Sequence, residues 1–424
     1  MSKKKSSPAG LQALYARVCG LDLHKNLIVA CVRILNTEDG TVQSTLRKFG
    51  TMTADLVELR QWLTDEKVTH VAMESTGIYW QPVFNLLESH FKLLLINAQH
   101  LKKVPGRKTD MKDAEWIAQL LQCGLLRPSF VPDRQQRELR ELTRQQSKLV
   151  QQRNAVGNRI QKVLESANIK LGSVATDVLG VSGRKIIEAL IAGEKDVSAL
   201  AELAQRRLRG KIPELQRALE GELTEHHIYL LRQLLTQYDF LENQIENVKE
   251  RVGAVAPSSF RAAVEQLDAV AGVGERGARA LLAETGTDMS RFPSHKHFAS
   301  WAGQCPGNHE SAGKRRSGKT PAANRHIDAV LTELARAAVR CKNSYFKSQY
   351  HRLAGRRGKK RAIGAVKHSL LVTVYFMLRD NKPYNDLGVD YFDKLNPQQR
   401  IRYHVRRLKE LGQEVELLPV AAAA

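Results

Sequence analysis

Cysteine is scarce in this 424-residue sequence, which has five cysteines and no pair at the CxxC spacing. This pattern excludes a disulfide framework or a CxxC-type zinc site, and it indicates a reducing compartment such as the cytoplasm. Aromatic residues make up only 6% of the chain, and no stretch reaches 18 apolar residues, so the sequence predicts no membrane span. The first ten residues contain three lysines but no apolar segment follows them, which predicts a solvated tail rather than a signal peptide.

Positive charge is what the sequence has in excess. Its 66 Lys plus Arg residues outnumber 44 Asp plus Glu residues, for a net charge of +22 and a pI of about 9.9. Residues 311–380 alone hold 17 Lys plus Arg against 3 Asp plus Glu. A solvated surface rarely concentrates charge so strongly, and we therefore predict a nucleic-acid-binding surface in the last third of the chain.

The order of apolar segments divides the chain into several parts. We predict a basic tail over 1–14, an α/β domain over 15–130, a helical region over 131–258 and a mostly helical basic domain over 259–424. In the α/β domain we expect strands at 15–22, 27–35 and 41–49, then helix 54–64, strand 68–74, helix 78–89, strand 91–97 and helix 110–123. Three antiparallel strands followed by αβαβα is the element order of an RNase H-like fold.

Two apolar seams run through the middle of the sequence. The first repeats every seven residues, and the second alternates spacings of four and three. They comprise Leu142, Leu149, Val156 and Val163 in the first seam, and Leu234, Tyr238, Leu241, Ile245, Val248 and Val252 in the second. Seams of this kind are typical of coiled coils, and both a hairpin within one chain and an intermolecular coiled coil fit the pattern. We assign no role to the helical insert between the seams, residues 171–210.

Four carboxylates occupy distinctive places in the α/β domain. Asp22 and Glu74 lie at the ends of two predicted apolar strands, and Asp110 and Asp113 share one face at the start of a helix. In an RNase H-like sheet the first and fourth strands are neighbours, and the last helix crosses them, so these acids are expected to form one pocket. Clustered carboxylates suit Mg²⁺ or Mn²⁺, and two such ions can promote phosphodiester cleavage. The simpler alternative is a lone strand carboxylate at Asp22 and a helix N-cap at Asp110.

Three segments around these acids resemble the DEDD motifs of the IS110/IS1111 (IS110-family) transposases. They are GLDLHK at 20–25, MESTG at 73–77 and GRKTDMKDA at 106–114. The resemblance implies a RuvC-like catalytic domain in which Asp22, Glu74, Asp110 and Asp113 bind Mg²⁺.

The C-terminal domain opens with a helix–Gly-Val-Gly–helix pattern over residues 267–282. Such a helix-hairpin-helix element brings Gly272 and Gly274 close to a DNA phosphate at a helix start. An ordinary αα-turn with a glycine C-cap explains the same pattern.

A serine in the basic segment is the candidate nucleophile. The segments at 298–307 and 311–316 resemble the C-terminal transposase domain of the same family, and the resemblance implies that Ser311 attacks DNA. Ala312 replaces the second glycine found in many members, and Ser317 remains the alternative nucleophile. Without the resemblance, a flexible surface serine in a phosphate-binding loop explains the segment.

Residues 313–320 also match the phosphate-loop pattern GxxxxGK[ST]. No apolar strand precedes them, so we do not predict an ATPase. A flexible basic turn is expected at 355–361, and Tyr345, Phe346 and Tyr350 either stack on bases or belong to the core. The predicted nucleic-acid-binding residues are Lys108, Gly272, Gly274, Lys314, Arg315, Arg316, Lys319, Arg356, Arg357, Lys359, Lys360 and Arg361.

The residues alone predict a metal-dependent phosphodiester enzyme with a basic second domain. The resemblance implies more: an RNA-guided DNA transposase that forms a covalent 5′-phosphoserine intermediate and acts on donor and target DNA. A structured bridge RNA then selects both DNAs, and a homotetramer completes each active site between protomers in the bacterial cytoplasm, at the nucleoid. The alternatives are a RuvC-like structure-selective nuclease that uses water, and a non-enzymatic nucleic-acid-binding protein.

Overall fold

A computed structural model describes residues 13–75, 77–97, 101, 113–307, 309–318, 320 and 324–418. The chain forms two compact units, Met1–Arg134 and Gln135–Ala424, which are described separately below. The further division predicted near residue 258 stays a prediction.

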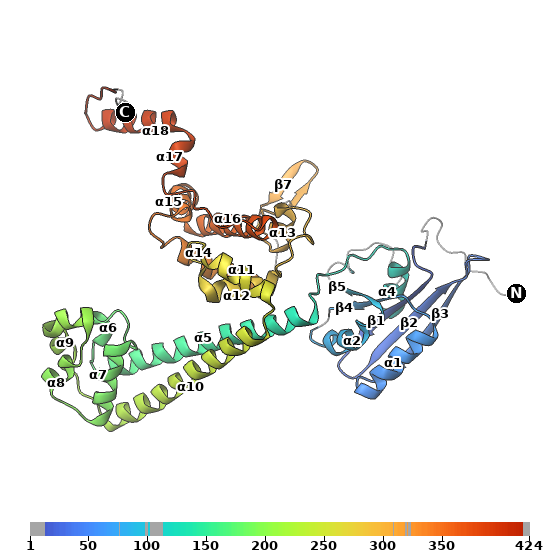
Figure 1. Ribbon diagram of the computed structural model, residues 1–424, viewed down its shortest axis with the longest axis horizontal. Helices are drawn as coiled ribbons and strands as arrows, with labels where there is room; N and C mark the ends of the chain where they lie inside the picture. Colours follow the sequence, from blue (N-terminus) through green and yellow to red (C-terminus); the bar gives the residue numbers. More distant parts are fainter. Residues whose placement is uncertain are drawn as a thin grey trace. The chain divides into compact units, whose positions relative to one another are not determined.

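The first unit is built on a five-stranded sheet (Figure 1). Its strands are β1 (Arg17–Leu23), β2 (Ile28–Leu35), β3 (Val42–Phe49), β4 (His70–Glu74) and β5 (Lys92–Ile96). They lie in the order β3-β2-β1-β4-β5, with β1 antiparallel to β2 and parallel to β4. The first and fourth strands are therefore neighbours, as the sequence predicts.

Helices cover both faces of this sheet. Successive residues of a strand point to opposite faces, and β1 accordingly divides its side chains between two cores. Leu21 packs in the core that contains α1 (Thr53–Asp65) and α2 (Trp80–Leu87), whereas Val18 packs in the core that contains α4 (Asp113–Gln122). The sheet thus forms the middle layer of three, with the acidic strand ends of β1 and β4 on the α4 side.

Two long helices of the second unit, α5 (Arg134–Ser166) and α10 (Glu225–Val255), lie side by side (Figure 1). Val156 and Leu241 share one buried core, and Arg153 pairs with Glu242 at 3.4 Å across the two helices. The two apolar seams therefore meet within one chain. The intermolecular coiled coil stays untested.

Short helices connect the two long ones and complete their core. They are α6 (Leu171–Val174), α7 (Val181–Ala192), α8 (Val197–Glu202), the 3₁₀ turn η1 (Arg206–Lys211) and α9 (Ile212–Ala218). Ile186, Leu200 and Leu215 from these helices are almost fully buried against the long pair. The insert that the sequence left without a role therefore packs into the core of the hairpin.

The C-terminal helices surround a second core of the same unit. They are α11 (Ser258–Asp268), α12 (Gly274–Thr285), α13 (His295–Trp301), α14 (Arg325–Ala338), α15 (Tyr345–Arg357) and α16 (Lys359–Asp380). A two-stranded hairpin of β6 (His309–Ser311) and β7 (Lys314–Ser317) lies between α13 and α14 along the chain. Phe346 is 1% exposed and belongs to this core, which settles one of the aromatic alternatives for that residue.

One helix in the described part of the chain, α16, is long and apolar enough to cross a membrane by length and composition. Val366, Leu370 and Val374 from this helix are at most 1% exposed and lie in the C-terminal core. These contacts identify α16 as a core helix.

The predicted basic turn at 355–361 is wrong. Residues 355–357 form the last turn of α15, and residues 359–361 form the first turn of α16. Gly358, with φ of +81°, is the single residue between the two helices. Arg and Lys are good helix formers, so one glycine at positive φ is enough to change the direction of the chain.

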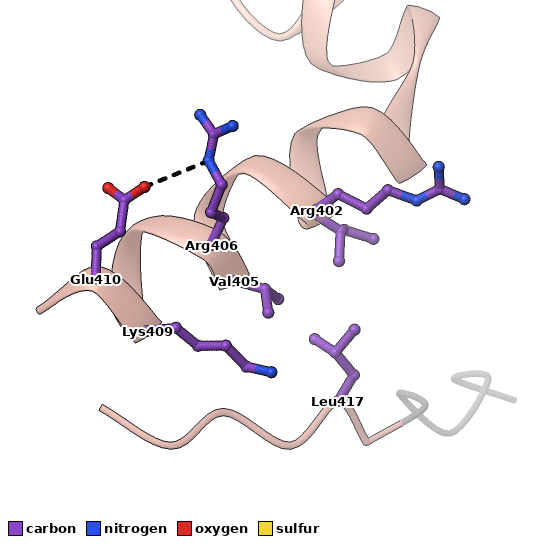
Figure 2. A pocket seen from close by; sticks show the side chains of 7 residues that line it. Arg402, Val405, Arg406, Lys409, Glu410 and Leu417 are labelled. Carbon is purple, nitrogen blue, oxygen red and sulfur yellow. Dashed lines mark ion pairs between the residues drawn. The ribbon is translucent and has the colours of Figure 1, made fainter. Parts of the chain in front are cut away.

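After α16 the chain forms α17 (Tyr391–Leu395) and α18 (Pro397–Glu410), neither of which contains a buried residue. A shallow hollow of about 530 Å³ lies on α18. Figure 2 shows its lining, in which Val405 and Leu417 point towards each other among charged side chains. Arg406 pairs there with Glu410 at 3.5 Å. Arg407 pairs with the same Glu410, and Arg400 pairs with Asp393 of α17.

Candidate functional site

The register of the sheet places two of the predicted acids at one edge. Leu21 of β1 pairs with Met73 of β4, so the next residues along the two strands are Asp22 and Glu74. Residues in register on neighbouring parallel strands lie about 5 Å apart and point to the same face. The carboxylates of Asp22 and Glu74 are therefore neighbours on the face that α4 covers.

Helix α4 brings a third acid to the same edge. A Cβ atom on Gly20 would lie 2.3 Å from the carbonyl oxygen of Ala114 and 2.4 Å from the backbone nitrogen of Ala118. The helix backbone thus rests directly on β1, which only glycine at position 20 permits. At the other end of α4, Gln122 accepts a hydrogen bond from the Leu14 amide, so α4 runs back along β1 and begins with Asp113 at the Asp22 edge.

Asp22 is reachable from solvent. Its side chain is 23% exposed, and one carboxylate oxygen lies 3.2 Å from Nε2 of His24. Sequence reasoning gave His24 no role, although the residue belongs to the first family-like motif. The imidazole is a polar neighbour for an anionic site and donates a hydrogen bond when Nε2 carries the proton.

Among the residues that the structure describes, no three His, Cys, Asp or Glu side chains lie close enough to hold a metal ion. Asp110 and Lys108 of the predicted site lie outside the described residues. Asp22, Glu74 and Asp113 therefore lie towards one edge of the sheet without forming a metal-binding cluster, and the four-acid metal site stays a prediction.

The candidate nucleophile ends a strand at the tip of a β-hairpin. Ser311 is the last residue of β6 and pairs with Lys314 of β7 across the two-residue turn Ala312–Gly313. Both turn residues have positive φ, +50° for Ala312 and +72° for Gly313, as in a type I′ turn. The side chains of Ser311 and Arg315 lie outside the described residues.

The same hairpin accounts for the phosphate-loop pattern at 313–320. Its residues form a turn and the strand β7 instead of a loop between a buried strand and a helix. This arrangement agrees with the prediction that the motif is not an ATPase loop. Lys319 lies outside the described residues.

The predicted helix-hairpin-helix glycines differ in their surroundings. Both have positive φ, but a Cβ atom on Gly272 would lie 2.2 Å from the backbone nitrogen of Ala338 in α14. This close approach explains Gly272 by packing inside the chain. Gly274 begins α12 and has open space around its Cα atom, so a phosphate contact at Gly274 stays a prediction.

The predicted basic residues separate into three places. Lys359, Lys360 and Arg361 line a groove of about 1680 Å³. Arg356 and Arg357 lie exposed in the last turn of α15 outside the groove lining, and Lys314 and Arg316 belong to β7.

A buried ion cluster that the sequence analysis missed lies next to the serine segment. Glu284, at the end of α12, is 2% exposed and accepts two hydrogen bonds from Arg144 of α5, at 2.6 and 2.9 Å. The same carboxylate accepts a hydrogen bond at 3.0 Å from Asn324, the N-cap of α14. Arg140 of α5 donates to the Glu284 backbone oxygen at 2.7 Å.

This cluster fixes the end of the segment that carries the hairpin. Asn324 caps α14 through a hydrogen bond to the His326 amide, and α14 is the first helix after the hairpin. Nothing in the local sequence LLAET marks Glu284 as paired, because its partners are 40 to 144 positions away along the chain.

Comparisons with known proteins find the same two regions. The family model described as a transposase of the DEDD IS110 type matches residues 19–169, and the model described as a transposase of the IS116/IS110/IS902 family matches residues 264–351. The two ranges together cover more than half of the 424 residues. A probable family 20 transposase from Pseudomonas aeruginosa is 28% identical over 275 residues, which are 64% of this chain and 71% of that protein.

Proposed function

Because the chain belongs to the IS110 family of transposases and is a DNA transposase or recombinase, we propose that it cleaves and exchanges DNA strands through a covalent 5′-phosphoserine intermediate. In this proposal Mg²⁺ assists the reaction, and a structured bridge RNA pairs with donor and target DNA. The observation that supports the proposal is the register of β1 and β4, which makes Asp22 and Glu74 neighbours at one edge of the first unit's sheet.

The donor set at this edge fits a hard divalent cation. Carboxylate oxygens are the ligands that Mg²⁺ and Mn²⁺ prefer, and Asp22, Glu74, Asp110 and Asp113 would hold the ions. When bound, the cations neutralise charge on the attacked phosphate and stabilise the leaving oxygen. Asp22 and Glu74 orient the site because the two strands fix their spacing.

Ser311 is the proposed nucleophile. Its Oγ atom bonds to the phosphorus while the bond from phosphorus to the 3′-oxygen breaks, and the hydroxyl proton passes to a general base. The released 3′-oxygen takes up a proton and becomes a 3′-hydroxyl. The phosphodiester bond energy is conserved in the serine–phosphate bond, so a 3′-hydroxyl of another strand reverses the reaction and completes exchange.

The partners belong to the same proposal. RNA pairing would supply sequence choice, which suits a protein rich in phosphate-binding charge. A tetramer, in which the acids and the serine of each active site come from different copies, follows from the family resemblance. We place this activity in the bacterial cytoplasm at the nucleoid.

A protein–DNA adduct on a denaturing gel tests the serine chemistry. The full chain with its RNA, Mg²⁺ and labelled DNA is expected to form an adduct that Ser311→Ala abolishes. Ser317→Ala, at the alternative serine, serves as the matched variant and is expected to keep the adduct. Loss of the adduct in Ser317→Ala alone would transfer the role to Ser317.

The same gel separates the alternative functions. Strand cleavage without an adduct would favour a RuvC-like nuclease that uses water. Asp22→Asn is expected to abolish both cleavage and adduct formation at every Mg²⁺ concentration, whereas DNA binding without any cleavage in the unmodified chain would favour a non-enzymatic binding protein.

A further inference from the structure

The groove of about 1680 Å³ in the second unit is strongly basic. Its walls come from residues 303–306, the end of β7, and helices α14, α15 and α16. Seven of its lining residues are cationic: Arg325, Arg336, Arg340, Lys359, Lys360, Arg361 and Lys367. Sequence analysis named three of these seven, because the other four are spread over α14, the turn after it and the middle of α16.

Almost all of this charge is uncompensated. Asp328 is the one acid among the lining residues, and Lys367 lies 2.6 Å from its carboxylate. The other six cations have no ion-pair partner in the part of the chain that the structure describes. Such an excess of unpaired charge on the walls of one groove is a site for a polyanion.

Hydrogen bonds between the lining residues hold the groove in shape. The Asp328 carboxylate accepts hydrogen bonds from Lys367 of α16 and, at 2.9 Å, from Gln304, which is 7% exposed. Lys367 holds the pKa of Asp328 below its usual value, so the acid stays ionised and paired. These bonds fix α14 against α16 and leave Arg336 and Arg340 exposed along the groove.

The dimensions favour one strand over a duplex. A B-form duplex has two backbones and needs a wide surface, whereas a groove of this volume holds only a few nucleotides of one strand. A second hollow of about 560 Å³ shares Thr332, Arg336 and Arg340 with the groove, so the basic surface continues along α14 as a track. Half-buried Tyr350 also lines the groove, and an aromatic ring among cations is the combination that binds single strands.

The groove begins where the serine hairpin ends. Ser317 and Gly318 line it, and Ser317 ends β7, which pairs with the strand that carries Ser311. The three residue-to-residue steps from Lys314 to Ser317 span roughly 10 Å of extended chain. A DNA strand attacked at the hairpin tip therefore reaches the groove within a few nucleotides.

We propose that this groove binds a single strand of DNA, namely the strand that continues from the phosphate attacked at the hairpin. Arg336 and Arg340 contact its backbone, and Tyr350 stacks on a base. The identity of the strand rests on the proposed function, whereas the groove's affinity for single-stranded DNA does not.

Binding of a short fluorescein-labelled oligothymidine to the full chain, without RNA or Mg²⁺, tests the groove. The double variant Arg336→Ala/Arg340→Ala is expected to raise Kd about 100-fold, since each of the two lost hydrogen bonds to a charged group contributes about a factor of ten. The slope of log K against log salt is expected to fall by about 1.4, which corresponds to two phosphate contacts.

The matched control removes the same charge elsewhere. Arg232 and Arg251 are exposed on α10, and Arg232→Ala/Arg251→Ala is expected to change Kd less than threefold. Equal losses in the two double variants would overturn the proposal, because binding would then follow net charge alone. Unchanged binding in the groove variant, or loss of binding only to an oligouridine, would overturn it as well.

The result is independent of the serine chemistry. Ser311→Ala is expected to bind oligothymidine as the unmodified chain does, so failure of the phosphoserine mechanism leaves this test intact. In the adduct assay, the groove variant is expected to need more DNA for half-maximal rate and to recover the full rate at saturation.

Discussion

Glu284 and Arg144 form a bidentate ion pair between α12 and α5, with donor–acceptor distances of 2.6 and 2.9 Å and a carboxylate that is 2% exposed. The second oxygen of Glu284 also accepts the Asn324 amide, so one buried carboxylate joins a long helix, the end of α12 and the cap of α14. These bonds hold α14, the helix that follows the serine hairpin, against the long helix α5.

Glu284→Gln is expected to lower the free energy of unfolding of the second unit by about 3 kcal/mol, because it leaves the guanidinium groups of Arg140 and Arg144 without a counter-charge. Urea unfolding of the full chain followed by tryptophan fluorescence measures the change. The control is Glu246→Gln, whose partner Lys249 is half exposed, and it is expected to cost less than about 1 kcal/mol. Equal losses of unfolding free energy in the two variants would contradict the role of Glu284 in holding α5, α12 and α14 together.

Gly20→Ala tests the close contact between the backbones of α4 and β1. The new methyl group would overlap the backbone of Ala114 and Ala118, so α4 must move away from β1 and carry Asp113 with it. We expect a loss of about 2 kcal/mol in stability and a larger relative loss in Mg²⁺-dependent strand cleavage. Gly253→Ala, in α10 with open space around its Cα atom, is expected to leave cleavage unchanged.

Ala312→Gly tests the hairpin turn. Ala312 has φ of +50°, which glycine adopts without the steric cost of a Cβ atom, so we expect about 0.5–1 kcal/mol of added hairpin stability. Slower amide hydrogen exchange in residues 309–317 measures the gain. Gly313→Ala places a methyl group at φ of +72° and is expected to accelerate exchange. A change of the exchange rate in the same direction in both variants would contradict a type I′ turn.

The pH dependence of stability tests His368, which lines the basic groove. Burial and the nearby His295 hold the pKa of His368 below 6.5, so the folded chain favours the neutral ring. This contribution is complete above pH 6.5 and is lost as the pH falls towards the folded-state pKa, because the unfolded chain binds the proton first. His368→Gln is expected to reduce the decline in unfolding midpoint between pH 7 and 5, whereas exposed His226→Gln is expected to leave it unchanged.

Local sequence signals predicted the sheet unit closely. The predicted strands 15–22, 27–35 and 41–49 end within two residues of the bounds of β1, β2 and β3. The basic segment at 355–361 was misread, because glycine and charge together resembled a loop whereas only Gly358 departs from helix. Helix propensity of Arg and Lys decided the outcome there.

The sequence by itself determined the order of strands and helices, the two apolar seams, the charge excess and the family to which the chain belongs, because these depend on periodicity, composition and short motifs. Only the tertiary structure decided which distant side chains meet. In the folded chain Glu284 pairs with Arg144, and α4 packs directly on Gly20. The two apolar seams pack against each other, and six unpaired cations line one groove. Contacts between residues of different elements leave no periodic trace in the sequence, since they follow from packing between elements and not from the pattern within any one of them.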